Sequence, residues 1–182
     1  AAAAEWIAAG NLFREEVTVQ REKTYGNSRF DLYVESLERK AFIEVKGVTL
    51  EENNIVRFPD APTIRGVKHL EELIRAGRDG YEAYLLLVIQ MKDVKYFEPN
   101  WETHPEFGET LRKAAAAGVH ILAYDCAITE DSMEICDPVP VNLEDKYSAN
   151  LCDQNKLRES RSVLTDTGRT ATETGTERNT HA

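Results

Sequence analysis

The sequence has little cysteine, no long apolar run and less positive than negative charge. Its 182 residues include 3 Cys, with 22 Lys and Arg against 32 Asp and Glu, a formal net charge of −10. The cysteines form no C-x-x-C motif, which indicates neither a disulfide scaffold nor a zinc site and fits a reducing cytoplasm. No apolar run approaches the roughly 18–20 residues that cross a bilayer, and no secretory signal opens the chain, so we expect a cytoplasmic protein without membrane contact. The acidic balance also argues against a generic basic coat for nucleic acid.

The length fits one domain of ordinary size followed by a tail. The composition changes near residue 143, after the last run with strand character, Val139–Leu143. Residues 144–182 are dominated by Thr, Ser, Glu and Arg and carry too little apolar surface to offset the entropy of ordering. We therefore expect a folded domain over residues 1–143 and a disordered polar tail over 144–182. The four alanines at the start, Ala1–Ala4, give no information on fold or function.

The hydrophobic periodicity between those ends alternates between helix and strand. Alternation with a period of two predicts half-buried strands, and the i, i+3, i+7 pattern predicts amphipathic helices. We predict helices over 5–13, 62–75 and 105–117, and strands from 17 to the turn at 25–28, over 29–35, 40–46, 84–90 and 119–125. A hairpin turn at 36–39 joins the second and third strands. This order, α-β-β-β-α-β-α-β, predicts an α/β fold with a mixed central β-sheet flanked by helices.

Two segments define the expected core. The apolar stripe of the helix over 62–75 consists of Val67, Leu70, Leu73 and Ile74, and we expect Gly77 and Gly80 to end this helix. The segment Tyr84–Gln90 is almost continuously apolar, which is typical of a strand that is buried on both faces of a sheet.

The predicted hairpin carries a pattern suited to metal chemistry. Glu44 and Lys46 are two apart on one strand, so their side chains share a face, and Asp31 lies on the partner strand. Two carboxylates and the carbonyl oxygen of Val45 make a hard oxygen site suited to Mg²⁺. Lys46 beside such an ion can hold or deprotonate a water that attacks phosphorus, or stabilise developing negative charge. The pattern is that of metal-dependent phosphodiester hydrolysis.

A surface hairpin with cross-strand ion pairs would show the same residues, because Asp and Glu-x-Lys recur easily in an acidic chain. The Glu-Val-Lys sequence, however, ends an apolar strand and is followed by Gly47 and a polar loop, where a substrate can approach. Both readings stay open at the level of spacing alone.

A second group of polar residues surrounds the start of the helix over 62–75. Either Asp60 or Thr63 is the N-cap of this helix, and Asp60 is alternatively part of the site. Arg65 and Lys68, three apart on one helix face, either hold phosphate oxygens with help from the helix dipole or are solvated cations.

Two further side chains belong to this candidate phosphate and DNA site. His69 either touches the substrate or packs within the helix interface. Gln90 is polar at the end of an otherwise apolar strand, and it either reaches the pocket or marks the sheet edge.

Several motifs in order closely resemble one known family, the sugar fermentation stimulation protein A (SfsA) family. They are Tyr25-Gly26-Asn27-Ser28-Arg29-Phe30-Asp31, Ile43-Glu44-Val45-Lys46-Gly47-Val48-Thr49-Leu50, Phe58-Pro59-Asp60-Ala61, Thr63, Arg65-Gly66, Lys68-His69-Leu70, Val88-Ile89-Gln90, Phe97-Glu98-Pro99-Asn100 and Gly118–Tyr124. The resemblance covers about residues 10–143.

The resemblance implies a C-terminal domain similar to the PD-(D/E)xK nuclease fold, also called restriction-endonuclease-like, and DNA as partner. It implies that Asp31, Glu44 and Lys46 take the positions of the nuclease signature and that Glu22 joins the metal site. It also implies that complete members carry a preceding OB-like β-barrel that contributes to DNA binding, and we expect this barrel to be absent here. The polar tail has no counterpart in the family.

Three functions agree with these observations, and the oligomeric state stays open. The leading hypothesis is a DNA phosphodiesterase that uses Mg²⁺ or Mn²⁺, held by Asp31, Glu44, the Val45 carbonyl and Glu22. The alternative is a non-catalytic DNA-binding regulator of sugar (maltose-type) metabolism genes with the same fold. The third is a degenerate fragment whose charges only maintain the hairpin.

Overall fold

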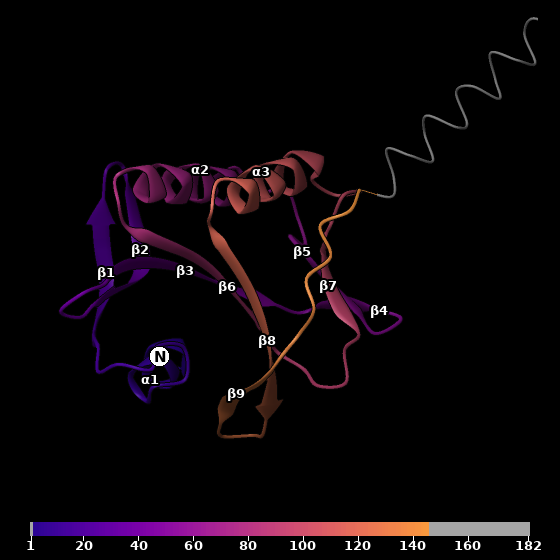
Figure 1. Cartoon of the computed structure of the whole chain (residues 1–182). Coiled ribbons are helices and arrows are strands. Elements are labelled where there is room, and N and C mark those ends of the chain that lie inside the picture. Colours follow the sequence, from indigo (N-terminus) through magenta and orange to yellow (C-terminus); the bar gives the residue numbers. More distant parts are fainter. Residues whose placement is uncertain (1, 146–182) are drawn as a thin grey trace, which may run out of the picture. The chain divides into compact units, whose positions relative to one another are not determined.

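A computed structural model describes residues 2–145, which are built around a six-stranded β-sheet (Figure 1). The helices are α1 (Ala2–Ala8), α2 (Ile64–Arg78) and α3 (Pro105–Ala116). The strands are β1 (Thr18–Tyr25), β2 (Ser28–Glu35), β3 (Lys40–Val48), β4 (Leu50–Glu52), β5 (Ile55–Phe58), β6 (Glu82–Ile89), β7 (Tyr96–Pro99), β8 (His120–Ile128) and β9 (Met133–Pro138). Among these residues no helix is both long enough and apolar enough to cross a membrane.

The large sheet has the order β1-β2-β3-β6-β8-β9 and is mixed. β1, β2 and β3 form an antiparallel meander, β3, β6 and β8 are parallel, and β9 returns antiparallel to β8. A smaller sheet of β4, β5 and β7 lies beside it, with β5 and β7 parallel. The α/β class with a mixed central sheet is confirmed.

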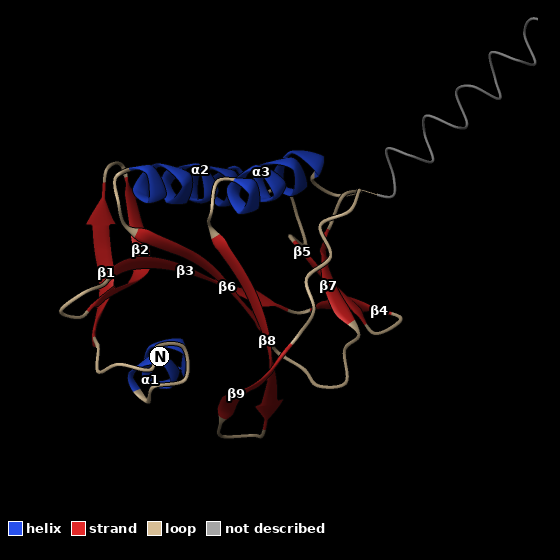
Figure 2. Cartoon of the chain, viewed as in Figure 1, coloured by secondary structure: helices blue, strands red, loops and turns tan. Residues whose placement is uncertain are grey.

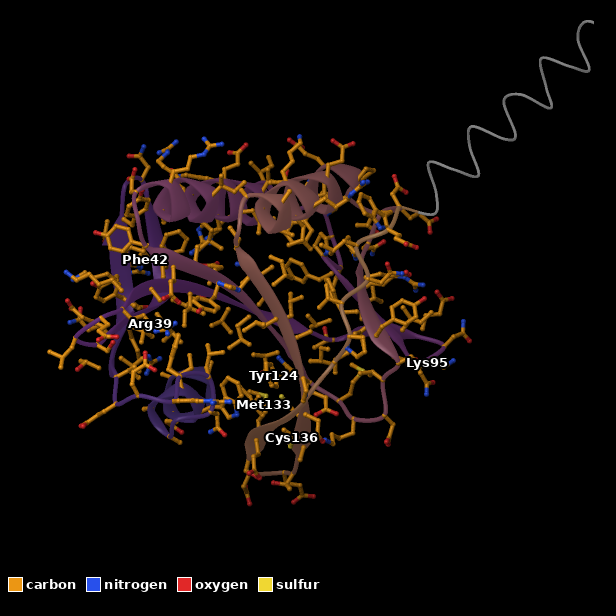
Figure 3. All side chains as sticks on the ribbon, viewed as in Figure 1. Arg39, Phe42, Lys95, Tyr124, Met133 and Cys136 are labelled. Atoms are coloured by element: carbon orange, nitrogen blue, oxygen red, sulfur yellow. The ribbon has the colours of Figure 1, made fainter. Side chains whose placement is uncertain are left out.

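Helices cover both faces of the large sheet. Figure 2 shows α2 and α3 along one face and the short α1 on the other. Each face has its own apolar cluster: Phe42 and Leu85 pack with residues of α2 and α3, whereas Ile43 and Leu86 pack with Ile7 of α1. In Figure 3, Phe42 accordingly lies toward α2 and Tyr124 toward α1. Residues 83–89 of β6 are buried throughout, as the apolar run predicts.

α2 is the helix that closes over the end of β3, and its start is set by a cap. Thr63 is the N-cap, and its side-chain oxygen accepts the backbone N–H of Gly66 at 3.0 Å, which satisfies a donor the helix leaves free. Val67, Leu70 and Leu73 are buried on the sheet side, as expected from the stripe. Asp60 is therefore not the cap of this helix.

Several boundaries differ from those the sequence predicts. The first helix ends at Ala8 rather than near residue 13, and Gly10 follows it with a φ of +86°. Gly77 lies inside α2 rather than ending it, because its backbone is helical; Asp79 is the C-cap, and Gly80 follows with a φ of +91°.

Four short strands, β4, β5, β7 and β9, have no counterpart in the sequence prediction. β4 and β5 lie in the segment expected to be a long polar loop, and β9 precedes Val139–Leu143, where Val141 forms a bridge with Phe97. The expected polar tail over 144–182 lies, beyond residue 145, outside the described residues.

Candidate functional site

The candidate site lies where the backbone pairing of β2 with β3 ends. The pairs run from Glu35 with Lys40 to Leu32 with Ile43, and Asp31 and Glu44 are the next positions of this register. Asp31 holds β3 through its side chain: Oδ2 accepts the backbone N–H of Val45 at 2.8 Å. Asp31 is therefore tied to the strand that carries Glu44 and Lys46.

Glu44 is the buried centre of the site. Alternation along β3 places it on the same face as Phe42, under α2, and only 2% of its surface is exposed. Its Oε1 accepts two hydrogen bonds, from Lys46 Nζ at 2.5 Å and from His69 Nδ1 of α2. Its Oε2 is buried and has no hydrogen-bond partner among residues 2–145.

A buried carboxylate oxygen without a partner is costly, since protein interiors satisfy nearly all such groups. A bound cation, or a water that donates a hydrogen bond to the oxygen, would remove this free-energy cost. Because Oε1 already accepts two hydrogen bonds, Oε2 is the oxygen of Glu44 that is left to bind a cation. Glu44 is thus arranged like a metal ligand: hydrogen bonds from Lys46 and His69 hold Oε1, and Oε2 is available to a cation.

Arg65 and His69 continue the network along α2. Arg65 Nε donates to His69 Nε2 at 3.4 Å, one helical turn away, while His69 Nδ1 contacts Glu44. His69 is 5% exposed, whereas Arg65 is exposed at the surface. The structure thus brings together five of the residues expected in the site: Asp31, Glu44, Val45, Lys46 and His69, with Arg65 behind the histidine.

Gln90 directly follows β6, the strand that pairs with β3. A Cβ at Gly47 would lie 2.8 Å from Gln90 Nε2, so the amide of Gln90 occupies the space that the glycine leaves. By the alternation of side chains along β3, this space is on the face opposite to Glu44 and Lys46. The backbone N–H of Gln90 also donates to the Val48 carbonyl at 2.9 Å.

Three other expected residues make contacts elsewhere. Lys68 Nζ donates to the Asn27 carbonyl at 3.0 Å and so ties α2 to the β1–β2 turn. Asp60 accepts from the Thr49 hydroxyl at 3.3 Å. Glu22, with a φ of +59°, forms an exposed ion pair with Arg29 at 3.5 Å. Their roles toward metal or DNA stay predictions.

The ligand set suits a hard cation that keeps much of its water. Among the described residues, no three His, Cys, Asp or Glu side chains gather into a ready-made metal cage. Mg²⁺ needs fewer protein ligands than that, because it is bound through one or two carboxylates and retains several waters. Asp31 and Glu44 supply this number of carboxylates on neighbouring strands, and their role as ligands, with the Val45 carbonyl, stays a prediction.

Two contacts of the site escape the sequence pattern. The sequence pattern does not predict that the Thr49 hydroxyl donates a hydrogen bond to Asp60. A small polar residue directly after a strand is common, and its type alone does not indicate a partner. The contact between His69 and Glu44 joins α2 to β3 over 25 positions, and local periodicity carries no information on such a contact.

The mixed sheet with its meander, its parallel crossover and the Asp, Glu-x-Lys group at the end of β3 defines the restriction-endonuclease-like class of α/β domains. The family model described as "Sugar fermentation stimulation protein RE domain" matches residues 1–132, and the chain belongs to this SfsA family.

Individual relatives agree with this membership. A sugar fermentation stimulation protein homolog of Clostridium beijerinckii is 59% identical over 139 residues, which cover 76% of this chain and 62% of the relative. A homolog of Ruminiclostridium cellulolyticum is 58% identical with the same coverage. The chain therefore spans about 62% of the length of these two curated relatives.

A solved structure of the family has the same fold. It is described as the structure of Pyrococcus furiosus SfsA in complex with Ca²⁺, and it is 29% identical with a TM-score of 0.71, over 77% of this chain and 62% of that one.

Proposed function

We propose that this domain is a DNA phosphodiesterase that depends on a divalent cation. The observation that carries the proposal is the buried Oε2 of Glu44, which has no partner among the described residues and lies on a carboxylate already held by Lys46. A structure that only maintained a hairpin would pair both oxygens.

Asp31, Glu44 and the carbonyl oxygen of Val45 would hold Mg²⁺ or Mn²⁺, with Glu22 as a further candidate. When bound, the ion supplies positive charge against the phosphate oxygens and lowers the pKa of water. The Ca²⁺ complex of the Pyrococcus furiosus relative supports a divalent cation in this family.

Lys46 is the residue best placed to act on the scissile phosphate. Its ammonium is held on Glu44 Oε1 at 2.5 Å and its side chain is 18% exposed, so it stands at the rim of the site rather than in bulk water. From there Nζ can orient an attacking water or stabilise the negative charge that develops on the phosphate oxygens.

Arg65 is the better placed of the two helix cations for binding phosphate. Within residues 2–145, its Nε–H is engaged on His69, and the guanidinium has further donors in a fork that suits phosphate. Lys68 is already bonded to the Asn27 carbonyl. Gln90 and Asp60, whose contacts are with Gly47 and Thr49, are further candidates for contacts with the DNA backbone.

The test is cleavage of plasmid and single-stranded DNA by purified protein with Mg²⁺ or Mn²⁺. Lys46→Ala should lower the rate by at least about a hundredfold, as removal of one catalytic donor does. Lys113→Ala is the matched control, since Lys113 is an exposed lysine of α3. Cleavage that survives Lys46→Ala unchanged would contradict the mechanism.

The name of the relatives favours one second candidate, a non-catalytic DNA-binding regulator of sugar metabolism genes. In that case the same residues form a cation or phosphate site without turnover. The cleavage experiment separates the two, because a regulator binds DNA without cutting it at any concentration of divalent cation.

A further inference from the structure

His69 occupies an unusual position in the site, because both of its ring nitrogens are engaged within the protein. Nδ1 contacts Glu44 Oε1, and Nε2 accepts from Arg65 Nε at 3.4 Å. With 5% of its surface exposed, the ring leaves no edge for a substrate. This geometry disagrees with a direct contact between His69 and DNA.

The partners also assign the proton of the ring. The Nε–H of Arg65 is a donor only, so Nε2 must offer its lone pair. The carboxylate of Glu44 is an acceptor only, so Nδ1 must carry the hydrogen. Arg65 thus selects the tautomer in which His69 donates to Glu44.

We propose that His69 is a positioning residue that orients Glu44 for the cation, a role that rests on the cation site proposed above. His69 and Lys46 both donate to Oε1, one from α2 and one from β3. A rotation of the carboxylate that moved Oε1 away would break both bonds. Oε2 is thereby held in the position where it has no hydrogen-bond partner in the described part of the chain, which is the position a ligand to the cation needs.

The physical basis is the same as for outer-shell groups around other metal ligands. Such groups fix the direction of the ligand before the ion arrives, so less freedom is lost on binding. The helix that carries His69 is itself fixed at its start by Thr63 and across the sheet by Val67 and Leu70, so the imidazole is held by rigid elements. Arg65 acts on Glu44 indirectly, because it donates a hydrogen bond to His69 and so fixes the imidazole.

Two substitutions separate positioning from simple packing. The amide nitrogen of Asn lies near the place of Nδ1, and that of Gln near the place of Nε2. His69→Asn therefore keeps a donor for Glu44, whereas His69→Gln directs its donor toward Arg65. Both variants leave a polar group of similar size in the same buried place, so a packing role would affect them alike.

The measurement is calorimetric titration of the full chain with Ca²⁺ and with Mg²⁺. We expect His69→Gln to weaken affinity by at least about tenfold and His69→Asn to stay within about threefold of the wild type, since loss of an outer-shell partner costs roughly 10–100-fold. Thermal melts show that both variants are folded. Equal affinities of the two variants, whether high or low, would overturn the role of His69.

A spectroscopic readout tests the tautomer independently of any cation. Long-range ¹H–¹⁵N spectra should show His69 protonated at Nδ1, identified as the imidazole signal absent from His69→Asn, and Arg65→Ala should shift it toward a mixture of tautomers. A ring protonated at Nε2 in the wild type would overturn the assignment. If the wild type binds cation with the expected His69 dependence but never cleaves DNA, the phosphodiesterase fails and the positioning role stands.

Discussion

At the scale of single residues, Asp31 has one role that the structure shows and a second that we propose. Its Oδ2 takes the backbone N–H of Val45 at the point where the ladder between β2 and β3 ends, so it maintains the sheet. Its carboxylate charge serves the proposed cation site. An amide can perform the first role but not the second, because an amide oxygen accepts the same hydrogen bond without the charge.

We therefore predict that Asp31→Asn keeps the stability of the wild type and loses divalent cation binding, whereas Asp31→Ala loses both. The cost of Asp31→Ala in the free energy of unfolding should be about 1 kcal/mol, the net value of one hydrogen bond. Urea denaturation measures the stability and calorimetry the binding. A destabilised Asp31→Asn would show that the charge itself maintains the strand pair.

The sequence predicts part of the site at this scale and not the rest, for a physical reason. Glu44 and Lys46 share a face because the period of a strand is two, and the hairpin turn brings Asp31 to the partner strand; both follow from local pattern. The partner of Glu44 on α2 does not follow, since it depends on how the helix crosses the sheet. The sequence therefore places His69 near the site, either touching the substrate or packed in the helix interface, but does not predict its contact with Glu44.

At the scale of elements, the long periodic segments are predicted and the short strands are not. α2, α3, β3, β6 and β8 each carry enough apolar residues in register to reveal their period. β4 has only three residues, all exposed, and is a strand because it pairs with β5, which in turn pairs with β7. Pairing between distant segments outweighs local propensity here.

The packing of α3 depends on one glycine that such patterns do not reveal. A Cβ at Gly108 would lie 2.4 Å from the ring of Trp101, whose side chain is buried. We predict that Gly108→Ala destabilises the protein by about 1–3 kcal/mol, the usual cost of overpacking.

Gly77 of α2 is the matched control for this prediction. Apart from its own helical turn, no described residue has an atom within 4 Å of a Cβ at Gly77, so Gly77→Ala should stabilise by about 0.5–1 kcal/mol through higher helix propensity. Thermal denaturation compares the two variants. Equal and small effects of both would show that Trp101 moves aside without cost.

At the scale of the whole molecule, the net charge of −10 opposes contact with DNA. Phosphate binding draws its free energy from cationic groups, and the site itself adds the carboxylates of Asp31 and Glu44 near the expected phosphate. A divalent cation held there would neutralise the charge of these two carboxylates. DNA affinity should therefore depend on the cation more than in a protein with a basic surface.

We predict that chelation of divalent cations by EDTA weakens binding of a short duplex by about tenfold, the equivalent of one charge-assisted contact. Ca²⁺ should restore the affinity. Glu44→Gln is the matched control: it keeps an oxygen for Lys46 and His69 but removes the charge, so its affinity should not respond to EDTA. Fluorescence anisotropy at constant ionic strength measures both proteins. If wild type and Glu44→Gln respond alike, the cation acts on the DNA or elsewhere on the chain, because Glu44 is then not its ligand.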